Sequence, residues 1–200
     1  MGHDEGEEIV EDHITRELAA GIEAHQRLLA DGVQSIAAAG GVLIDTLRAG
    51  GKLLWCGNGG SAADCQHIST ELVARFSGRE RDALPSVALT TDTSLLTALS
   101  NDYTFERVFS RQVEALGRAG DALVAISTSG SSPNILAAAQ AARARGMSVV
   151  ALVGARPTPL AELAQALVAI PSTDTQRIQE LHIAVGHILC GLIEDALFPS

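Results

Sequence analysis

The chain has 200 residues, a formal net charge of −10 and a hydrophobic content of 46%, with only 3% aromatic residues. That length suits one domain with a full-sized core, and the acidic balance excludes the basic surface that binding of nucleic acid requires. No apolar run reaches the length of a membrane span, and no charged-then-apolar leader opens the sequence. We therefore expect neither a transmembrane segment nor a targeting leader. Cys56, Cys65 and Cys190 are widely spaced in apolar patterns, which predicts free, buried thiols in a reducing cytoplasm.

Apolar patterns predict helices that alternate with strands. Residues 5–50 are expected to form two helices, the first with an apolar stripe that packs against another subunit. The stripe consists of Ile9, Ile14, Leu18 and Ile22. Further helices are expected at about 61–76, 93–99, 105–116, 133–145, 159–165 and 175–197, and strands at about 52–56, 86–90, 122–126, 148–153 and 167–170. This order predicts a three-layer α/β/α sandwich with a five-stranded parallel sheet, in which N-terminal helices (1–50) precede an α/β domain (51–200).

A glycine cluster follows the first expected strand and leads into a helix. It reads Gly57-Asn58-Gly59-Gly60-Ser61. Glycines let the backbone approach a ligand, and the first N–H groups of the helix face an anion. We expect Ser61 to cap this helix, with Asp64 as its capping-box partner. The pattern therefore predicts a phosphate or nucleotide site.

Two side chains further along the same helix turn this loop into a candidate active site. His67 and Glu71 lie four residues apart, so they share one helical face. A surface ion pair explains the same spacing equally well.

The loop also fits a dinucleotide fingerprint, Gly57-x-Gly59-x-x-Ala62. That reading requires an acid about 20 residues later, at the end of the second strand. Asp82 lies in a loop before the second strand and Asp92 follows it at a longer spacing. The dinucleotide site is therefore the weaker interpretation.

A second polar loop follows the third expected strand, with five hydroxyl groups around one glycine in the segment 127–132. Pro133 is placed as the first residue of the next helix. Hydroxyls, loop N–H groups and the helix dipole together can hold a phosphate. No Gly-Lys-Ser/Thr is present, so the loop is not a nucleotide triphosphate site. An ordinary loop that caps a helix is the alternative.

The terminal helix carries polar residues among apolar ones. His187 has apolar neighbours, which also suit a buried core histidine. Spacing alone would align His187 with Glu180, seven residues earlier. Gln179 is eight residues earlier and about a fifth of a turn off that line. The pattern leaves the choice open.

Together these motifs resemble the phosphoheptose isomerases, also called sedoheptulose 7-phosphate isomerases, within the sugar isomerase (SIS) fold. The resemblance covers about residues 50–198. The motifs are Cys56-Gly57-Asn58-Gly59-Gly60-Ser61, Gln66-His67-x-x-x-Glu71, Asn101-Asp102-Tyr103, Ser127-Thr128-Ser129-Gly130-x-Ser132-Pro133-Asn134 and Ile178-Gln179-Glu180-x-His182-x-x-x-x-His187.

The resemblance implies conversion of D-sedoheptulose 7-phosphate to D-glycero-D-manno-heptose 7-phosphate, the first step towards bacterial heptose precursors and lipopolysaccharide. It implies one zinc ion per subunit and a homotetramer with sites at subunit interfaces. The implied zinc ligands are His67, Glu71, Gln179 and His187. The implied substrate contacts are Asn58, Gly59, Gly60, Ser61, Glu71, Asn101, Asp102 and Gln179, with Ser127, Thr128, Ser129 and Ser132 at the phosphate.

Within this resemblance, Glu71 is expected to act as the base and His187 as an acid or base. Zinc would either polarise the carbonyl or fix the geometry, and the sequence leaves both open. Two departures stand out: Cys65 replaces a small residue, and the segment 156–159 replaces a glycine-rich turn. We expect neither to touch the mapped chemistry.

Two alternatives accompany this reading. A similar SIS protein is a non-catalytic partner of the bacterial replication initiator and lacks the glutamate and the second histidine. Glu71 and His187 are both present here, which favours the enzyme. The other alternative is an isomerase of a different sugar phosphate, which the hydroxyl pattern read by Asn101 and Asp102 would decide.

Overall fold

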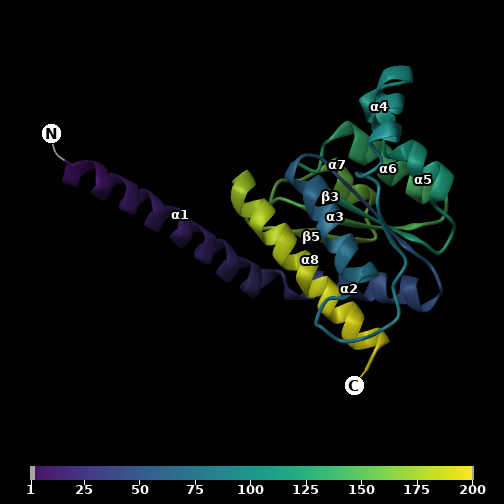
Figure 1. The fold of residues 1–200 in the computed structure, drawn as a ribbon, viewed down its shortest axis with the longest axis horizontal. Coiled ribbons are helices and arrows are strands. Elements are labelled where there is room, and N and C mark those ends of the chain that lie inside the picture. The colour runs from purple at the N-terminus through teal and green to yellow at the C-terminus, as the bar shows by residue number, and fades with distance from the viewer. Residues whose placement is uncertain (1–2, 200) are drawn as a thin grey trace.

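The computed structural model describes residues 3–199, with side chains from residue 9 onward. Five parallel strands form one sheet between two helical layers, in the order β2-β1-β3-β4-β5 (Figure 1). The strands are β1 (Leu53–Gly57), β2 (Ser86–Ala88), β3 (Ala122–Ser127), β4 (Ser148–Val153) and β5 (Ala166–Ala169). The three-layer α/β/α architecture expected from the sequence is confirmed.

The helices follow the expected order with local differences. They are α1 (His3–Asp31), α2 (Val33–Arg48), α3 (Gly60–Val73), α4 (Thr93–Asp102), α5 (Ser110–Leu116), α6 (Pro133–Ala144), α7 (Pro159–Leu163) and α8 (Thr175–Leu197). Helix α3 was expected to run to about residue 76 and ends at Val73. The helix expected over 105–116 is interrupted, because a 3-10 turn over Phe105–Arg107 precedes α5. The break lets Val108 and Phe109 enter the core. Helix α4 also runs three residues further than expected, to Asp102.

Strand β1 shows how the sheet divides the core. Successive side chains of a strand point to opposite faces. Leu53 and Trp55 belong to the cluster packed against α2, α3 and α8, whereas Leu54 and Cys56 belong to the cluster packed against α5, α6 and α7. All four are almost fully buried. Both faces of the sheet are therefore covered, which explains the continuous apolar strands.

The three cysteines are free and buried, as expected. Burial raises the pKa of each thiol, to about 12 for Cys190. They are neutral packing residues.

Helix α1 leaves the body of the molecule (Figure 1). It packs on the core through Ala24 and Leu28. The apolar stripe predicted on this helix is exposed in the single chain, with 70% of Ile9 and 60% of Ile22 accessible. Within the described residues, no single helix is long and apolar enough to cross a membrane. Only together do the segments Ile9–Asp31 and Val33–Arg48, which are bent by 72° relative to each other, have the length and composition of a membrane span.

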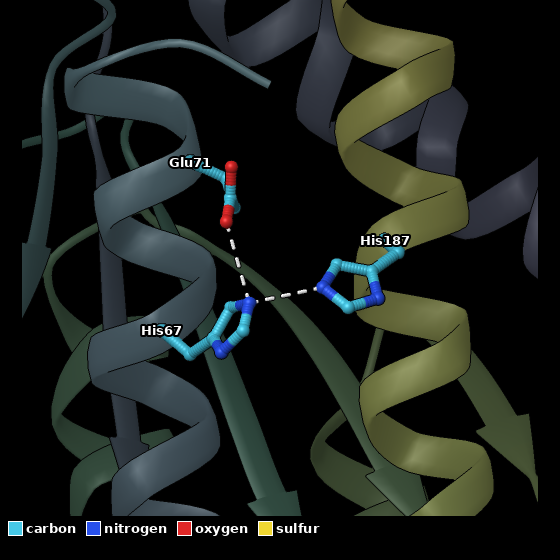
Figure 2. A group of neighbouring side chains, drawn as sticks. All are labelled: His67, Glu71 and His187. Carbon is cyan, nitrogen blue, oxygen red and sulfur yellow. Dashed lines mark hydrogen bonds and ion pairs between the residues drawn. The ribbon is translucent and has the colours of Figure 1, made fainter. Parts of the chain in front are cut away.

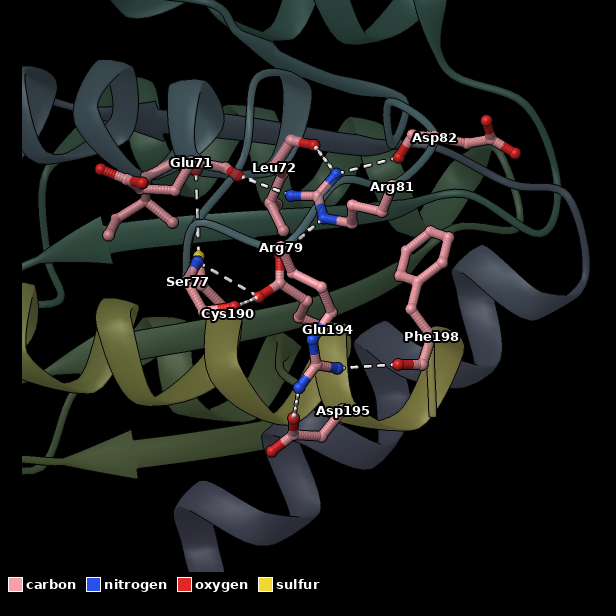
Figure 3. Close-up of polar contacts among 11 residues, drawn as sticks. Glu71, Leu72, Ser77, Arg79, Arg81, Asp82, Cys190, Glu194, Asp195 and Phe198 are labelled. Carbon is pink, nitrogen blue, oxygen red and sulfur yellow. Dashed lines mark hydrogen bonds and ion pairs between the residues drawn. The ribbon is translucent and has the colours of Figure 1, made fainter. Parts of the chain in front are cut away.

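A buried ion pair ties the segment after α3 to the end of α8 (Figure 3). Arg81 Nε donates to Glu194 Oε1 at 2.7 Å, and the two side chains are 1% and 3% exposed. The backbone N–H and the hydroxyl of Ser77 also donate to Glu194. Burial raises the pKa of Glu194, but the hydrogen bonds from Ser77 and Arg81 outweigh it and lower the pKa from 4.5 to about 2.

This pair predicts a pH-dependent stability. A carboxyl whose pKa is lower in the folded state stabilises the fold above its unfolded pKa, and the contribution is lost as the pH falls through the folded pKa. Glu194→Gln leaves Arg81 buried without its partner, which costs about 3–5 kcal/mol near neutral pH. We expect the difference between wild type and Glu194→Gln in urea unfolding to shrink as the pH falls from about 5 to about 2, through the unfolded and then the folded pKa of Glu194. A difference that stays constant over this range would contradict the ion pair.

Candidate active site

Helices α3 and α8 lie side by side and run parallel, although more than a hundred residues separate them in the sequence (Figure 1). Gly60 at the start of α3 faces Gln179, and Ile68, eight residues further along α3, faces Gly186. A Cβ atom on Gly186 would come within 2.7 Å of Ile68 Cδ1. The glycine therefore allows the two helices to approach closely at their middle.

The close approach brings three candidate residues together (Figure 2). His67 Nε2 lies 3.3 Å from Glu71 Oε1 and 3.0 Å from His187 Nε2. His67 and Glu71 share one face of α3, as predicted, and Figure 2 shows His187 reaching them from α8. Half of the His67 side chain is accessible, so a ligand can reach the group.

Of the two partners that spacing left open for His187, the structure pairs Glu180 with another residue. Glu180 accepts a hydrogen bond from Arg177 at 2.6 Å, whereas the His187 ring points to His67. The buried core histidine of α8 is His182, which is 1% exposed and contacts the carbonyl of Val153 at 3.3 Å. Burial lowers the pKa of His182 to about 4, so this residue is neutral.

The three convergent side chains fit a metal ion. One ligand atom from each of His67, Glu71 and His187 lies within 4.8 Å of the others. Zinc binds imidazole nitrogen and carboxylate oxygen at about 2.0–2.2 Å, which puts neighbouring ligand atoms about 3.3 Å apart around a tetrahedral ion. The distances of 3.0 and 3.3 Å agree with that spacing.

Gln179 lies beside the glycine loop. A Cβ atom built on Gly60 would come within 2.8 Å of its Nε2 atom. Along α8, Gln179 precedes His187 by eight residues, or about 12 Å of helix rise. Its place as a fourth ligand stays a prediction.

The glycine loop differs from the expected cap. Helix α3 begins at Gly60 after Gly59, which has a φ of 57° and provides no side-chain cap. The prediction that Ser61 and Asp64 form a capping box is therefore wrong. Ser61 lies inside the first turn and is buried, and Oδ2 of Asp64 has no hydrogen-bond partner within the described residues. The glycine allows the turn without a side-chain cap, so the first N–H groups of α3 stay available to an anion.

A pair of amides joins the two candidate loops. Asn58, in the glycine loop, and Asn134, in the first turn of α6, exchange hydrogen bonds of 2.9 and 2.8 Å. Asn134 was not among the predicted contact residues. The sign of its role in the sequence is an amide in the glycine loop and another just after the serine loop. These two hydrogen bonds fix the loops that follow β1 and β3 relative to each other.

Hydrogen bonds within the serine loop order its hydroxyl groups. Ser127 Oγ accepts the N–H of Gly130 at 3.1 Å and lies 3.3 Å from Ser132 Oγ. Ser129 Oγ accepts the N–H of Ser131 at 3.3 Å. Pro133 is the first residue of α6, as predicted. Thr128 and Ser129 line a cavity of about 280 Å³, whose other walls include Arg156, Ser172 and Thr175.

The turn over 156–159 lies beside the serine loop. Thr158 Oγ1 donates to the carbonyl of Gly130, which is not itself a mapped residue, at 2.7 Å. Gly130 has a φ of 60°, and a Cβ atom there would lie 2.0 Å from Thr158 Oγ1. Arg156 lines the same cavity as Ser129. The turn therefore supports the serine loop and brings a cation to its cavity.

Comparison with known proteins identifies the family. A family model described as SIS domain matches residues 18–154. The phosphoheptose isomerase of Rhodospirillum rubrum is 57% identical over 169 residues, which cover 84% of this chain and 89% of that protein. The chain belongs to the phosphoheptose isomerases of the SIS domain family.

Solved phosphoheptose isomerases have the same fold. The structure from Neisseria gonorrhoeae superposes with a TM-score of 0.88 and 43% identity, over 93% of this chain and 99% of that one. The structure from Francisella tularensis superposes with a TM-score of 0.89 and 36% identity, over 93% of this chain and 98% of that one.

One pair of predicted contact residues lies away from the rest in this phosphoheptose isomerase. Asn101 and Asp102 end α4 and are exposed, with Asn101 Nδ2 donating to Asp102 Oδ1 at 2.8 Å. Asp92 caps α4 by accepting the N–H of Leu95. Helix α4 has no buried residue and projects from the body (Figure 1). The single chain therefore presents Asn101 and Asp102 on a protruding helix.

The contact between Gly60 and Gln179 can be tested. In Gly60→Ala the new Cβ atom displaces the flexible end of Gln179, so the fold should survive. We expect zinc affinity to fall about 10- to 100-fold, as for a disturbed metal ligand. Competition with a chelator measures this affinity. Gly41→Ala is the matched control, because a Cβ atom on this helical glycine meets nothing within 4 Å. Equal zinc affinity in Gly60→Ala and wild type would remove Gln179 from the ligand set.

Proposed function

We propose that the enzyme converts D-sedoheptulose 7-phosphate into D-glycero-D-manno-heptose 7-phosphate, a step that leads to bacterial heptose precursors. One observation carries the proposal. Glu71 and His187, from two distant helices, converge on His67 in a chain that is 57% identical to a phosphoheptose isomerase. A carboxylate and an imidazole at one point suit the proton transfers of a ketose–aldose exchange.

The proposed reaction moves two protons. Glu71 removes a proton from C1 of the ketose, which leaves an enediolate, and a proton is returned to C2. His187 transfers the hydroxyl proton between the oxygens on C2 and C1. The side chain of Glu71 is 25% exposed, so substrate can reach the carboxylate from solvent. Atoms balance, because the product is an isomer of the substrate.

We assign one zinc ion per subunit to His67, Glu71 and His187, with Gln179 as a fourth ligand. The donor set of two imidazoles and a carboxylate supports zinc. When bound, zinc would stabilise negative charge on the sugar oxygens or fix the geometry of its ligands. The chain's own residues orient the imidazoles through the packing of α3 on α8.

The two loops are assigned to opposite ends of the substrate. Ser127, Thr128, Ser129 and Ser132 hold the phosphate at the start of α6, where the helix dipole favours an anion. Asn58, Gly59, Gly60 and Ser61 contact the sugar. Asn101 and Asp102 read its hydroxyl groups.

The substrate contacts on α4 favour an oligomer in which a neighbouring subunit completes the site, as a homotetramer would. Helix α4 has no buried residue, and the stripe on α1 is exposed. A cavity of about 550 Å³ lies between α1 and α8, with Leu18, Ile22 and Leu29 in its wall. Apolar surface of this kind marks contacts between proteins. The free, buried thiols favour a cytoplasmic location.

The substrate is tested by incubation with sedoheptulose 7-phosphate while formation of the aldose is followed by NMR. We expect turnover of this ketose in preference to pentulose and hexulose phosphates. Turnover of a pentulose or hexulose phosphate alone would keep the isomerase and change the substrate. Absence of turnover with every sugar phosphate would reject the proposed reaction.

The role of Glu71 is tested with Glu71→Gln. Glutamine keeps the shape but cannot accept the proton, so the rate should fall about 10²- to 10⁴-fold with substrate binding largely kept. Exchange of the C1 hydrogen with solvent deuterium should disappear, even when the variant carries zinc. If added zinc restores the rate, Glu71 acts only as a metal ligand. Normal exchange in the zinc-loaded variant would move the base elsewhere.

A further inference from the structure

The ring of Phe76 lies against the ring of His187. Their centroids are 5.8 Å apart and the planes are inclined by 26°, which is a stacked arrangement. Phe76 follows the end of α3 by three residues and is partly buried against the core. A Cβ atom on Gly191 would lie 3.6 Å from Phe76 Cε1, so the ring covers the turn of α8 that follows His187. No motif in the sequence pointed to this phenylalanine.

The His187 ring therefore has two aromatic neighbours. His67 meets it edge-on, with centroids 5.0 Å apart and planes inclined by 62°. Aromatic rings at centroid distances of about 4.5–7 Å attract one another in these geometries. Because His187 is partly exposed, these two contacts restrict a side chain that solvent would leave free to rotate.

Phe76 is itself held by the buried ion pair. The next residue, Ser77, donates both its backbone N–H and its hydroxyl to Glu194. The same carboxylate accepts from Arg81, whose other nitrogens donate to the carbonyl of Glu71 at 2.8 Å and of Leu72 at 2.9 Å (Figure 3). Figure 3 shows Arg81 between the end of α3 and Glu194 on α8.

These contacts connect the two candidate proton-transfer residues through the backbone. Arg81 occupies the carbonyl of Glu71, which at a helix end lacks an intrahelical partner. Glu194 occurs seven residues after His187, or about two turns of α8. One network therefore fixes the end of the helix that carries Glu71, the loop that carries Phe76 and the helix that carries His187.

We propose that Phe76 is a positioning residue that sets the orientation of the His187 ring, and that the Arg81–Glu194 pair, through Ser77, holds Phe76 in place. The proposal rests on the assignment of His187 to the reaction. Phe76 is not one of the residues assigned to contact the substrate or its phosphate. Its loss should therefore reduce kcat and metal affinity, which depend on the direction of the His187 nitrogens, and leave KM nearly unchanged.

The first test replaces the flat ring. Phe76→Leu keeps an apolar side chain of similar size, so the fold should survive. We expect kcat and zinc affinity each to fall about 10- to 100-fold, with KM within about threefold. Phe76→Tyr keeps the stacked ring and should restore both. Phe198→Leu is the matched control, since this ring lies 5.6 Å from Arg81 and follows the end of α8, eleven residues after His187.

The second test weakens the support of Phe76. Ser77→Ala removes one hydrogen bond to Glu194 without leaving a buried charge unpaired. We expect a several-fold fall in kcat, smaller than for Phe76→Leu, because the backbone N–H of residue 77 still donates to Glu194. Adding Ser77→Ala to Phe76→Leu should cost nothing more, because both act through the same ring. Asp195→Asn is the control, because Asp195 is exposed and pairs with Arg79, 3.3 Å away.

The outcomes separate this proposal from the proposed function. If Phe76→Leu keeps wild-type kcat and zinc affinity, or if Phe76→Tyr fails to restore them while its melting temperature is unchanged, the positioning role is overturned. Additive losses in the double variant would overturn the link through Ser77. If wild type turns over no sugar phosphate, the proposed function fails, and zinc affinity of the Phe76 variants still decides whether the ring orients His187.

Discussion

The close, parallel packing of α3 on α8 is the constraint on which the candidate site depends. Gly186 permits the approach at Ile68, and the Arg81–Glu194 pair fixes the far ends of the helices. Only with this spacing do the nitrogens of His67 and His187 lie 3.0 Å apart. A buried ion pair contributes little net stability, but removal of one partner is costly. Here the pair fixes one relative position of two helices that share a site.

The sheet supplies the second constraint. Strands β1 and β3 are neighbours, so the glycine loop and the serine loop leave the same edge of the sheet side by side. Ligands of parallel sheets bind at this edge. The exchange of hydrogen bonds between Asn58 and Asn134, and the contact of Thr158 with Gly130, convert two flexible loops into one surface. A sugar phosphate between the loops would meet helix N-termini and hydroxyls instead of a lysine.

The sequence by itself determined the elements and the two loops. Leu53 to Cys56 alternate between two apolar faces, Pro133 begins α6, and the spacing of His67 and Glu71 puts them on one face of α3. These features follow from local geometry, which a short stretch of residues sets alone. The expected capping box of Ser61 is wrong, and the cause is again local. The positive φ of Gly59 starts the helix one residue early and buries the serine.

Only the tertiary structure decided which distant residues meet. Spacing along α8 aligned His187 with Glu180, but the helix faces α3 and brings His187 to His67, while Glu180 binds Arg177. Phe76 has no pattern around it that predicts a role, because its neighbour lies more than a hundred residues away. The contact of Thr158 with Gly130 likewise joins two segments that are 28 residues apart in the sequence. Contacts between elements depend on how helices pack across the sheet, and a one-dimensional pattern carries no information on that packing.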